Sequence, residues 1–171
     1  MDIKAFEKLT YGVYIVSAGN AVTKNAFVAT TAFQVTASPN QIAVACNKNN
    51  FTLSLVTENK AFAVSVLKQH YTPATMGTFG FRSGKDFDKF AHCEFLMGTQ
   101  TNTPIVTTDA LAWFECKLTQ QVDVGTHILL IGEVLDSSVL DDANEPLTYA
   151  YYHQVKGGMA PKNAPHAQEE K

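Results

Sequence analysis

Residues 113–134, WFECKLTQQVDVGTHILLIGEV, decide the fold of this chain. In the first half of this stretch, the polar side chains Glu115, Lys117 and Thr119 alternate with apolar ones, which predicts a strand with one face in solvent. Residues 127–134 are more apolar, and we expect that strand to be buried on both faces. Residues 123–125 leave room only for a tight connection, so the two strands are predicted to pair as an antiparallel hairpin.

Short β-rich runs precede this hairpin along the chain. They are rich in valine, alanine and phenylalanine, and they fall at residues 11–18, 26–31, 41–46 and 61–67. Residues 52–60 and 72–79 are predicted to be short helices, and residues 82–104 an irregular surface excursion. Many short strands with few helices favour an antiparallel barrel or sandwich. A doubly wound α/β sheet needs long helices between its strands, and the second half of the chain lacks them.

The composition excludes several classes of protein. The chain has 171 residues, of which 46% are hydrophobic and 17% charged, and its formal net charge is -3. These values suit one globular domain. Arg82 is the only arginine against 18 threonines, so binding to nucleic acid, which relies on clustered basic side chains, is not expected. No apolar run reaches the roughly 20 residues of a membrane-spanning helix, so no membrane association is expected. A bound anion must therefore rest largely on hydroxyl and backbone N–H groups.

The sequence carries no local signature of a metal site or of a common nucleotide-binding motif. Cys46, Cys93 and Cys116 form no CxxC pair and no basic-then-apolar leader opens the chain, so we expect a cytoplasmic protein with reduced thiols. The five histidines form no HExxH or HxxxH pair, so no metal is predicted. Neither GxGxxG after the first strand nor GxxxxGK[ST] occurs, which argues against Rossmann-type and P-loop sites.

Two segments at strand ends are candidate anion sites. Residues 25–39, NAFVATTAFQVTASP, place threonines around Phe33, and hydroxyls and free amides at a strand end can accept a phosphate. Residues 46–52, CNKNNFT, put a lysine and three asparagines in a loop before Thr52, which can cap a helix whose N-terminus favours an anion. The same residues also suit an ordinary pleated strand and a polar turn with an N-cap, so both alternatives stay open.

Two further candidates lie later in the chain. Residues 79–90, FGFRSGKDFDKF, gather the only arginine, a serine and two lysines between four phenylalanines. This pattern suits a planar, phosphorylated ligand, and it equally suits a solvated charge run. His127 begins an apolar strand, on the same face as Leu129 and Ile131 if the strand is regular. A histidine there can be a hydrogen-bonded structural residue or an acid or base.

In their order along the chain, these segments resemble the flavin reductase-like family, whose fold is the FMN-binding split β-barrel. The resemblance covers roughly residues 5–162. Each motif alone is only loosely characteristic of the family, but seven motifs in this order are specific for it. The motifs are YGVYIVSA at 11–18, NAFVATTAFQVTASP at 25–39, QIAVACNKNNFT at 41–52, FAVSVL at 62–67, FGFRSGKDFDKF at 79–90, GTHILLIGEV at 125–134 and PLTYAYYHQVKGG at 146–158. Within the family, the chain looks most like flavoredoxins and the flavoprotein half of rubredoxin-fused flavin reductases.

The resemblance implies a mainly β fold, an antiparallel Greek-key split β-barrel with a few short helices, in residues 1–156, followed by an extended tail at 157–171. It also implies which residues bind FMN. These are Thr30, Thr31, Ala32 and Phe33 along the cofactor, Asn47, Lys48, Asn50 and Thr52 near its ribityl phosphate, and Phe81, Arg82, Ser83 and Lys89 completing the phosphate side. His127 matches the histidine of a Gly-Asp-His pattern on the nicotinamide side, and Thr126 replaces the aspartate here.

The activity that the resemblance implies is that of an FMN-binding oxidoreductase of the flavin reductase type. Such a protein takes hydride from NADH or NADPH onto FMN and passes electrons to free flavin, a metal complex or a small redox protein such as a rubredoxin. The resemblance also implies a homodimer. Two alternatives stay open: a flavoredoxin-like electron carrier reduced by a protein partner, which the missing aspartate favours, and a non-redox ligand-binding barrel. No CxxC pair follows residue 158, so a fused rubredoxin is not expected.

Overall fold

The predicted hairpin forms the middle of the sheet. In the computed structural model, which describes residues 1–159 except the side chains of Ile3, Lys4 and Glu7, the hairpin consists of β8 (Ala110–Asp123) and β9 (His127–Val139). At the turn, the Asp123 carboxylate accepts a hydrogen bond from the N–H of Gly125 at 3.0 Å. Gly125 has a φ of 102°, a conformation that favours glycine. The hairpin is confirmed, and both strands extend beyond the predicted ends.

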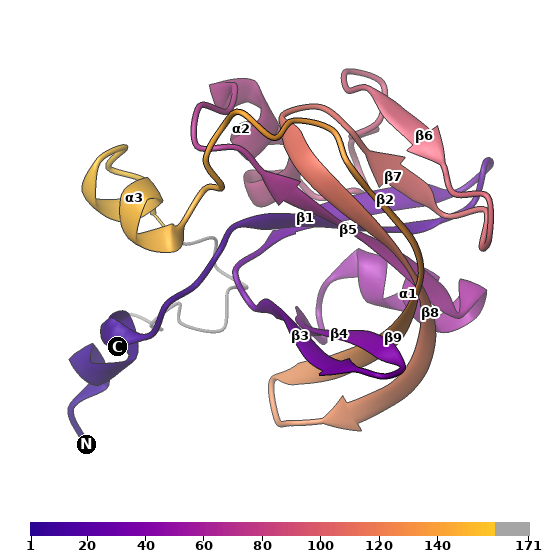
Figure 1. The fold of residues 1–171 in the computed structure, drawn as a ribbon, viewed down its shortest axis with the longest axis horizontal. Coiled ribbons are helices and arrows are strands. Elements are labelled where there is room, and N and C mark those ends of the chain that lie inside the picture. The colour runs from indigo at the N-terminus through magenta and orange to yellow at the C-terminus, as the bar shows by residue number, and fades with distance from the viewer. Residues whose placement is uncertain (160–171) are drawn as a thin grey trace.

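Within the described residues, one antiparallel sheet has the strand order β2-β1-β5-β8-β9-β4-β3 (Figure 1). Its other strands are β1 (Tyr14–Gly19), β2 (Lys24–Ala29), β3 (Ala32–Ala37), β4 (Asn40–Asn47) and β5 (Ala61–Leu67). The hairpins β1–β2 and β3–β4 lie at opposite ends of this order, so crossovers join β2 to β3 and β4 to β5, as in a Greek key. A separate ribbon pairs β6 (Phe95–Met97) with β7 (Pro104–Val106).

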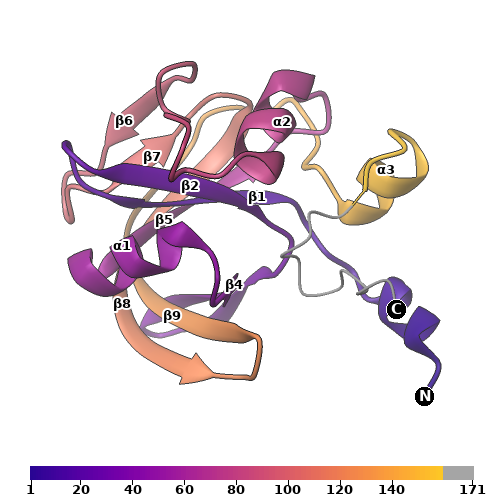
Figure 2. The ribbon, with the colours of Figure 1, turned by 180° about the vertical axis from the view of Figure 1, so that it is seen from behind.

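The sheet curls until its two ends face each other, and a helix fills the split. Figures 1 and 2 show β1, β2 and β5 in one layer, β3, β4 and β9 in the other, and α1 (Phe51–Asn59) between the open edges. The other helices are α2 (Pro73–Phe81), α3 (Tyr149–Gln154) and a 3-10 helix at Ile3–Lys8. Among the described residues, no helix is long and apolar enough to cross a membrane. The architecture is therefore an open antiparallel barrel with few short helices, as predicted.

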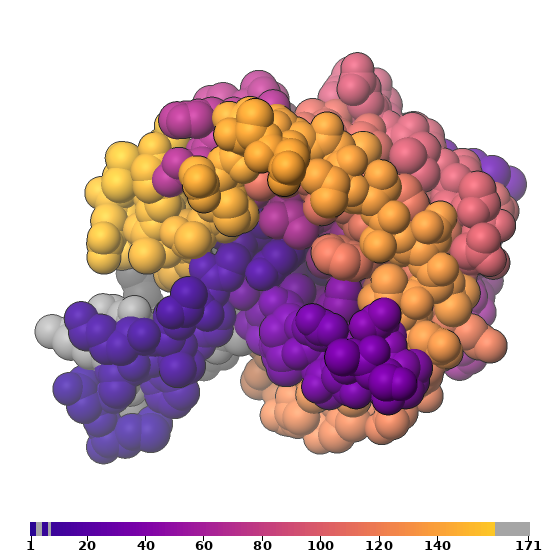
Figure 3. Space-filling view, viewed as in Figure 1, coloured from indigo at the N-terminus to yellow at the C-terminus, as the bar shows by residue number. Residues whose placement is uncertain are grey.

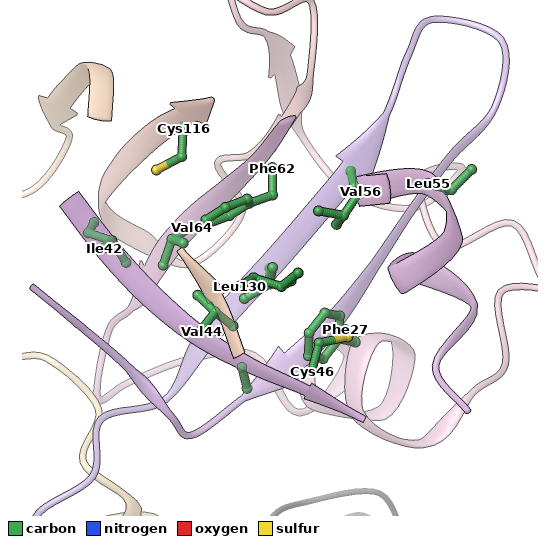
Figure 4. Close-up of a cluster of buried hydrophobic side chains, with 13 residues drawn as sticks. Phe27, Ile42, Val44, Cys46, Leu55, Val56, Phe62, Val64, Cys116 and Leu130 are labelled. Carbon is green, nitrogen blue, oxygen red and sulfur yellow. The ribbon is translucent and has the colours of Figure 1, made fainter. Parts of the chain in front are cut away.

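The core lies between the two layers of the barrel. Figure 4 shows Val56 of α1 pointing toward strand side chains such as Leu130, and Leu55 of the same helix belongs to the same buried cluster. Cys46 and Cys116 are fully buried in the same cluster, and burial raises the pKa of both thiols to about 12. Both thiols are therefore protonated and unreactive at neutral pH, and they serve as small apolar core residues.

Glu115 corrects the expectation of a polar outer face on β8. The residue is fully buried, and its carboxylate accepts hydrogen bonds from the N–H groups of Gln100 (3.1 Å) and Thr101 (2.5 Å) and from the Thr101 hydroxyl (2.7 Å). The loop between β6 and β7 supplies these donors, and the pairing of β8 with β9 shifts next to Glu115. Alternation in the sequence cannot show that a distant loop satisfies a carboxylate.

The stretch 25–39 divides into two strands. A turn at Thr30 and Thr31 separates β2 from β3, and the sequence pattern does not predict β3 as a separate strand. β3 is an edge strand whose side chains are mostly exposed, including Phe33 and Val35. A strand without a buried face carries no alternation of apolar and polar residues, which is why its pattern gives no signal.

Two other expectations change, one for β9 and one for the C-terminal tail. The outer face of β9 is not buried, because Leu129 and Ile131 are partly exposed. Of the predicted tail, residues 157–159 are described, and they return to α3, where the N–H of Gly158 donates to the carbonyl of Tyr152 at 3.0 Å. The remainder of that tail lies outside the described residues.

Candidate functional site

A cavity of about 520 Å³ opens beside β2 and β4, where α1 begins and α2 ends. Its volume lies within the roughly 300–1,000 Å³ typical of sites for small molecules and cofactors. It is lined by Asn25, Phe27, Val28, Ala29 and Thr30 of the β2 side, by Ala45, Asn47, Asn50 and Phe51 of β4 and the start of α1, and by Phe79, Gly80, Phe81, Arg82, Ser83, Gly84 and Lys89 of α2 and the following loop. Three segments far apart in the sequence therefore build one site.

The N-terminus of α1 borders this cavity. Asn50 caps the helix, because its side-chain oxygen accepts a hydrogen bond from the N–H of Thr52 at 3.0 Å. Thr52 is fully buried, and its hydroxyl accepts a hydrogen bond from the side chain of Asn25 at 3.0 Å. This bond ties the start of the helix to β2. A helix N-terminus has free N–H groups and a partial positive charge, so this end of the cavity favours an anion.

Lys89 is a buried cation in the cavity wall. Its side chain donates hydrogen bonds to the carbonyls of Ala26 (2.7 Å) and Phe79 (3.4 Å), and the residue is 4% exposed. Neither ion pair of the described residues includes it. Burial lowers the pKa of Lys89 to about 8, because the ammonium loses hydration and gains no negative partner. An anionic ligand in the cavity would supply that partner.

Thr30 also lacks a partner. Its hydroxyl oxygen is buried and makes no hydrogen bond to any described residue, although the residue lines the cavity. A buried hydroxyl without a hydrogen bond destabilises a fold by about 1–3 kcal/mol. Such a group is therefore a sign that a ligand atom completes its hydrogen bonding here.

The loop after α2 forms the rim of the cavity. The Arg82 guanidinium stacks on the ring of Phe87, 4.3 Å from the ring centroid, and the Arg82 side chain is exposed. Gly84 lies against the side chain of Asn25, so close that a side chain at Gly84 would collide with that amide. The loop therefore sits directly on β2, and it holds a second cation at the mouth of the site.

The structure brings together seven of the twelve residues that the sequence assigns to cofactor binding. These seven line the cavity, and they are Thr30, Asn47, Asn50, Phe81, Arg82, Ser83 and Lys89. Thr52 lies behind the wall, where it supports the cap of α1. Thr31 does not line the cavity, but its carbonyl accepts a hydrogen bond at 3.1 Å from the N–H of Ala45, which does.

The remaining three residues of that set point elsewhere. Lys48 is exposed, and its Nζ lies 2.7 Å from a carboxylate oxygen of Asp123, where the lysine also lowers the pKa of that carboxyl. Ala32 and Phe33 line a different cavity, at the mouth of the barrel. Their assignment as cofactor contacts stays a prediction, and the geometry does not group them with the other seven.

His127 lies at the first position of β9, opposite Asn47 of β4. Its register also puts it on the face of Leu129 and Ile131, as expected of a regular strand. The side chain is 8% exposed, and its Nδ1 lies 2.8 Å from the hydroxyl oxygen of Thr126. His127 does not line the cavity itself, but its strand neighbour Asn47 does. Thr126, which stands where the family pattern has an aspartate, thus contacts the imidazole.

Sequence reasoning misses several residues of the cavity wall. Asn25 is buried and ties β2 to α1, Phe51 opens α1, Gly80 lines the cavity from α2, and Gly84 lets the loop approach β2. The quoted motifs contain all four residues. Only the buried asparagine carries a signal of its own, because a polar residue at the start of a buried strand needs a hydrogen-bond partner.

The comparisons with known proteins agree on one family. The chain matches the family model described as "Flavin reductase like domain" over residues 6–158. It is 46% identical over 164 residues to a ferric-chelate reductase (NAD(P)H) of Archaeoglobus fulgidus, which covers 96% of this chain and 96% of that protein. It is 44% identical over 165 residues to the high molecular weight rubredoxin of Moorella thermoacetica, which covers 96% of this chain and 71% of that protein.

A solved structure supports the same assignment. BorF, the flavin reductase component of a bacterial two-component tryptophan halogenase, has a TM-score of 0.74 and 27% identity, over 85% of this chain and 89% of BorF. The chain therefore belongs to the flavin reductase-like family. The predictions of the family, of a split β-barrel and of an oxidoreductase that works with a flavin and NAD(P)H are confirmed.

Proposed function

We propose that this chain binds FMN in the 520 Å³ cavity and passes electrons from NADH or NADPH to free flavin, a metal complex or a small redox protein. Two groups in the cavity wall carry the proposal: the buried Lys89 cation, which has no anionic partner among the described residues, and the Thr30 hydroxyl, which has no hydrogen-bond partner there. Both fit a ligand with a phosphate and several polar atoms. A bound FMN would supply the acceptor for the hydride of the nicotinamide and the donor of electrons to the next acceptor.

The chain's own residues would hold the two parts of FMN differently. Lys89 and the free N–H groups at the start of α1 are suited to the phosphate, and Arg82 adds a second cation at the rim. Ala29 and Ala45 are small residues in the strand wall, and a flat ring can lie against such a wall. The Thr30 hydroxyl can donate or accept one hydrogen bond to the same ligand.

A role for His127 on the nicotinamide side belongs to the same proposal. The imidazole lies on the outer face of β9, one strand from the cavity wall, and the Thr126 hydroxyl contacts its Nδ1. The N–H of Lys48 donates to the carbonyl of Thr126 at 3.1 Å, so the turn that carries His127 is tied to the loop after β4. His127 would then orient the nicotinamide rather than bind FMN.

A titration of FMN into cofactor-free protein, followed by flavin fluorescence, tests the binding site. We expect Lys89→Met to weaken FMN binding by about tenfold or more, because it removes the buried cation and keeps an apolar stem. Riboflavin lacks the phosphate, so its affinity should change far less. Lys85→Met, in the same loop and exposed, is the matched control and should stay within about twofold. An equal loss for FMN and riboflavin would contradict the phosphate assignment.

Stopped-flow mixing of the FMN-loaded protein with NADH or NADPH tests the reaction. Bleaching of the bound flavin by either nicotinamide supports the reductase. Bleaching only by a reduced rubredoxin selects the electron carrier, which the replacement of the aspartate by Thr126 favours. A protein that takes up no FMN is a non-redox ligand-binding barrel, and the proposal fails.

We also infer a homodimer, a small redox protein as partner and a cytoplasmic location. The exposed edge strand β3, with Phe33 and Val35, supports the dimer. Likeness to the high molecular weight rubredoxin supports a rubredoxin-like partner. The unpaired thiols of Cys46, Cys93 and Cys116 suit a reducing compartment. The division into a barrel at residues 1–156 and a tail at 157–171 stays part of this proposal.

A further inference from the structure

A second cavity, of about 360 Å³, lies at the mouth of the barrel. Figure 3 shows a hollow between β3, in purple, and the orange chain at the end of β9. Side chains of β1, β3, β4, β5, β8 and β9 line this cavity. It shares no lining residue with the cavity beside α1. The two cavities also lie at opposite ends of the same short segment, because Ala29 and Thr30 line one and Ala32 and Phe33 the other.

The lining of this second cavity is uncharged. Three aromatic rings, those of Tyr14, Phe33 and Phe114, come from three different strands, and Ile42 and Val64 form part of the apolar floor. No lysine, arginine, aspartate, glutamate or histidine lines it, whereas Arg82 and Lys89 line the other cavity. An ion that entered the barrel mouth would lose hydration and gain no opposite charge, so this cavity disfavours charged molecules.

Polar side chains nevertheless converge on the mouth. Asn40 and Gln41 of β4 and Ser137 of β9 line the cavity, and their side chains make no hydrogen bond to any described residue. Burial raises the pKa of Tyr14, so its hydroxyl is neutral and keeps its proton at physiological pH. These groups offer donors and acceptors around an aromatic-lined floor, as sites for small polar ring compounds do.

We propose that the barrel mouth binds a neutral compound of one aromatic ring with a hydroxyl or carbonyl group, at a site separate from the FMN cavity. The ring would lie among the three aromatic side chains, and its polar group would reach Gln41 or Ser137. Offset or edge-to-face contacts with aromatic side chains favour a ring over an aliphatic chain. The volume, near the lower end of the usual range, suits a single ring rather than a dinucleotide.

The test is an NMR titration of the isotope-labelled full chain, loaded with FMN, with p-cresol as the probe. We expect backbone shifts at Ala32, Gln41 and Ser137, with the resonances of Thr30 and Asn50 unchanged. The anion p-toluate has the same ring and methyl group, and we expect it to bind at least about tenfold more weakly. Shifts at Thr30 and Asn50 in place of those at the barrel mouth would show that p-cresol enters the FMN cavity, and they would overturn the proposal.

Two variants locate the probe. Ser137→Trp fills the mouth and should weaken p-cresol binding by about tenfold or more. The matched control is Ser138→Trp, one residue further along β9, because its side chain points to the opposite face. If Ser137→Trp does not fold, Gln41→Leu keeps the size of the side chain, removes the polar group and should weaken binding several-fold. Unchanged affinity of the folded variants for p-cresol overturns the proposal. The absence of shifts at the lining residues also overturns it, even where a second copy of the chain covers the barrel mouth and so prevents binding.

Discussion

The buried Lys89 makes the affinity for FMN depend on pH. In the empty protein its pKa is about 8, and a bound phosphate would raise this pKa by stabilising the ammonium. Above pH 8, binding must therefore take up a proton, and the dissociation constant should rise by up to about tenfold per pH unit. Fluorescence titrations from about pH 6.5 to 9.5 measure this slope. Lys89→Met should abolish it, and a slope that survives in the variant assigns the titration to another group.

Arg82 and Lys48 should behave differently, although the sequence assigns both to the phosphate. Arg82 lines the cavity rim, and Arg82→Ala should weaken FMN binding by about tenfold, the loss of one charge-assisted contact. The Lys48 ammonium lies on Asp123, outside the lining, so Lys48→Ala should change the affinity by less than about twofold. Calorimetric titration of both variants decides the matter, and a large loss in Lys48→Ala would show that this lysine swings into the cavity.

His127→Ala should separate binding from reduction. The imidazole does not line the cavity, so the variant should bind FMN with unchanged affinity. It should slow the reduction of bound flavin by NADH or NADPH, which stopped-flow absorbance measures. Thr126→Val removes only the hydroxyl that contacts Nδ1, and it should slow reduction to a smaller extent. A rate that is unchanged in both variants would remove His127 from the nicotinamide side.

Asp109 holds the helix that carries one wall of the cavity. Its carboxylate accepts hydrogen bonds from the N–H of Thr72 at 2.7 Å and the hydroxyl of Thr75 at 2.6 Å, and it pairs with Lys68 at 3.3 Å. Thr72 directly precedes α2, so Asp109, which lies in the turn between β7 and β8, caps the start of this helix. Burial alone would raise the pKa of Asp109, but the hydrogen bonds from Thr75, Thr72 and Lys68 outweigh it and hold the pKa below 3.8.

Asp109→Asn should lower the free energy of unfolding by about 1–2 kcal/mol at neutral pH, because the amide keeps one acceptor and loses the charge. Since the folded state lowers the pKa, this stabilisation is present above the unfolded pKa and is lost as the pH falls through the folded one. Urea unfolding at several pH values should show the difference between the two proteins shrinking below about pH 4. Asp142→Asn, an exposed carboxylate, should show no such difference.

The elements that the sequence predicts are those with a buried face. The hairpin β8–β9, β5 and both longer helices lie within a few residues of their predicted places. Alternation marks the start of β8, apolar runs mark β5 and β9, and Thr52 and Pro73 mark the starts of the two helices. β3 shows no such pattern, since both of its faces are exposed. The ribbon β6–β7 is stabilised by buried polar contacts, such as the hydroxyl of Ser65 on the carbonyl of Val106 at 2.7 Å, and these contacts leave no pattern in the sequence.

The same limit applies to the candidate site. The motifs locate the three segments that meet at the cavity, and seven of the twelve residues assigned to cofactor binding line it. The sequence cannot tell which lysine of the loop is buried, because Lys85 and Lys89 occur in similar surroundings along the chain. Tertiary packing decides this, since only Lys89 reaches the carbonyls of Ala26 and Phe79.

At the scale of the whole molecule, the edge strand β3 offers a surface for a second copy. Val35 is 48% exposed on it, and an unprotected edge strand with apolar side chains favours pairing with another chain. We expect Val35→Lys to convert a dimer into a monomer, as measured by light scattering after size-exclusion chromatography. Val22→Lys adds the same charge at a position that is 90% exposed in the β1–β2 turn, and it should leave the dimer intact.

The unsatisfied groups of the cavity also link the lifetime of the protein to its ligand. Without a ligand, the folded chain keeps the Lys89 cation and the Thr30 hydroxyl away from water with incomplete partners, and both lower its stability. A ligand that binds only the folded form shifts the equilibrium further from unfolding as its concentration rises. Proteases act on the unfolded fraction, so the amount of this protein in a cell should follow the supply of flavin phosphate.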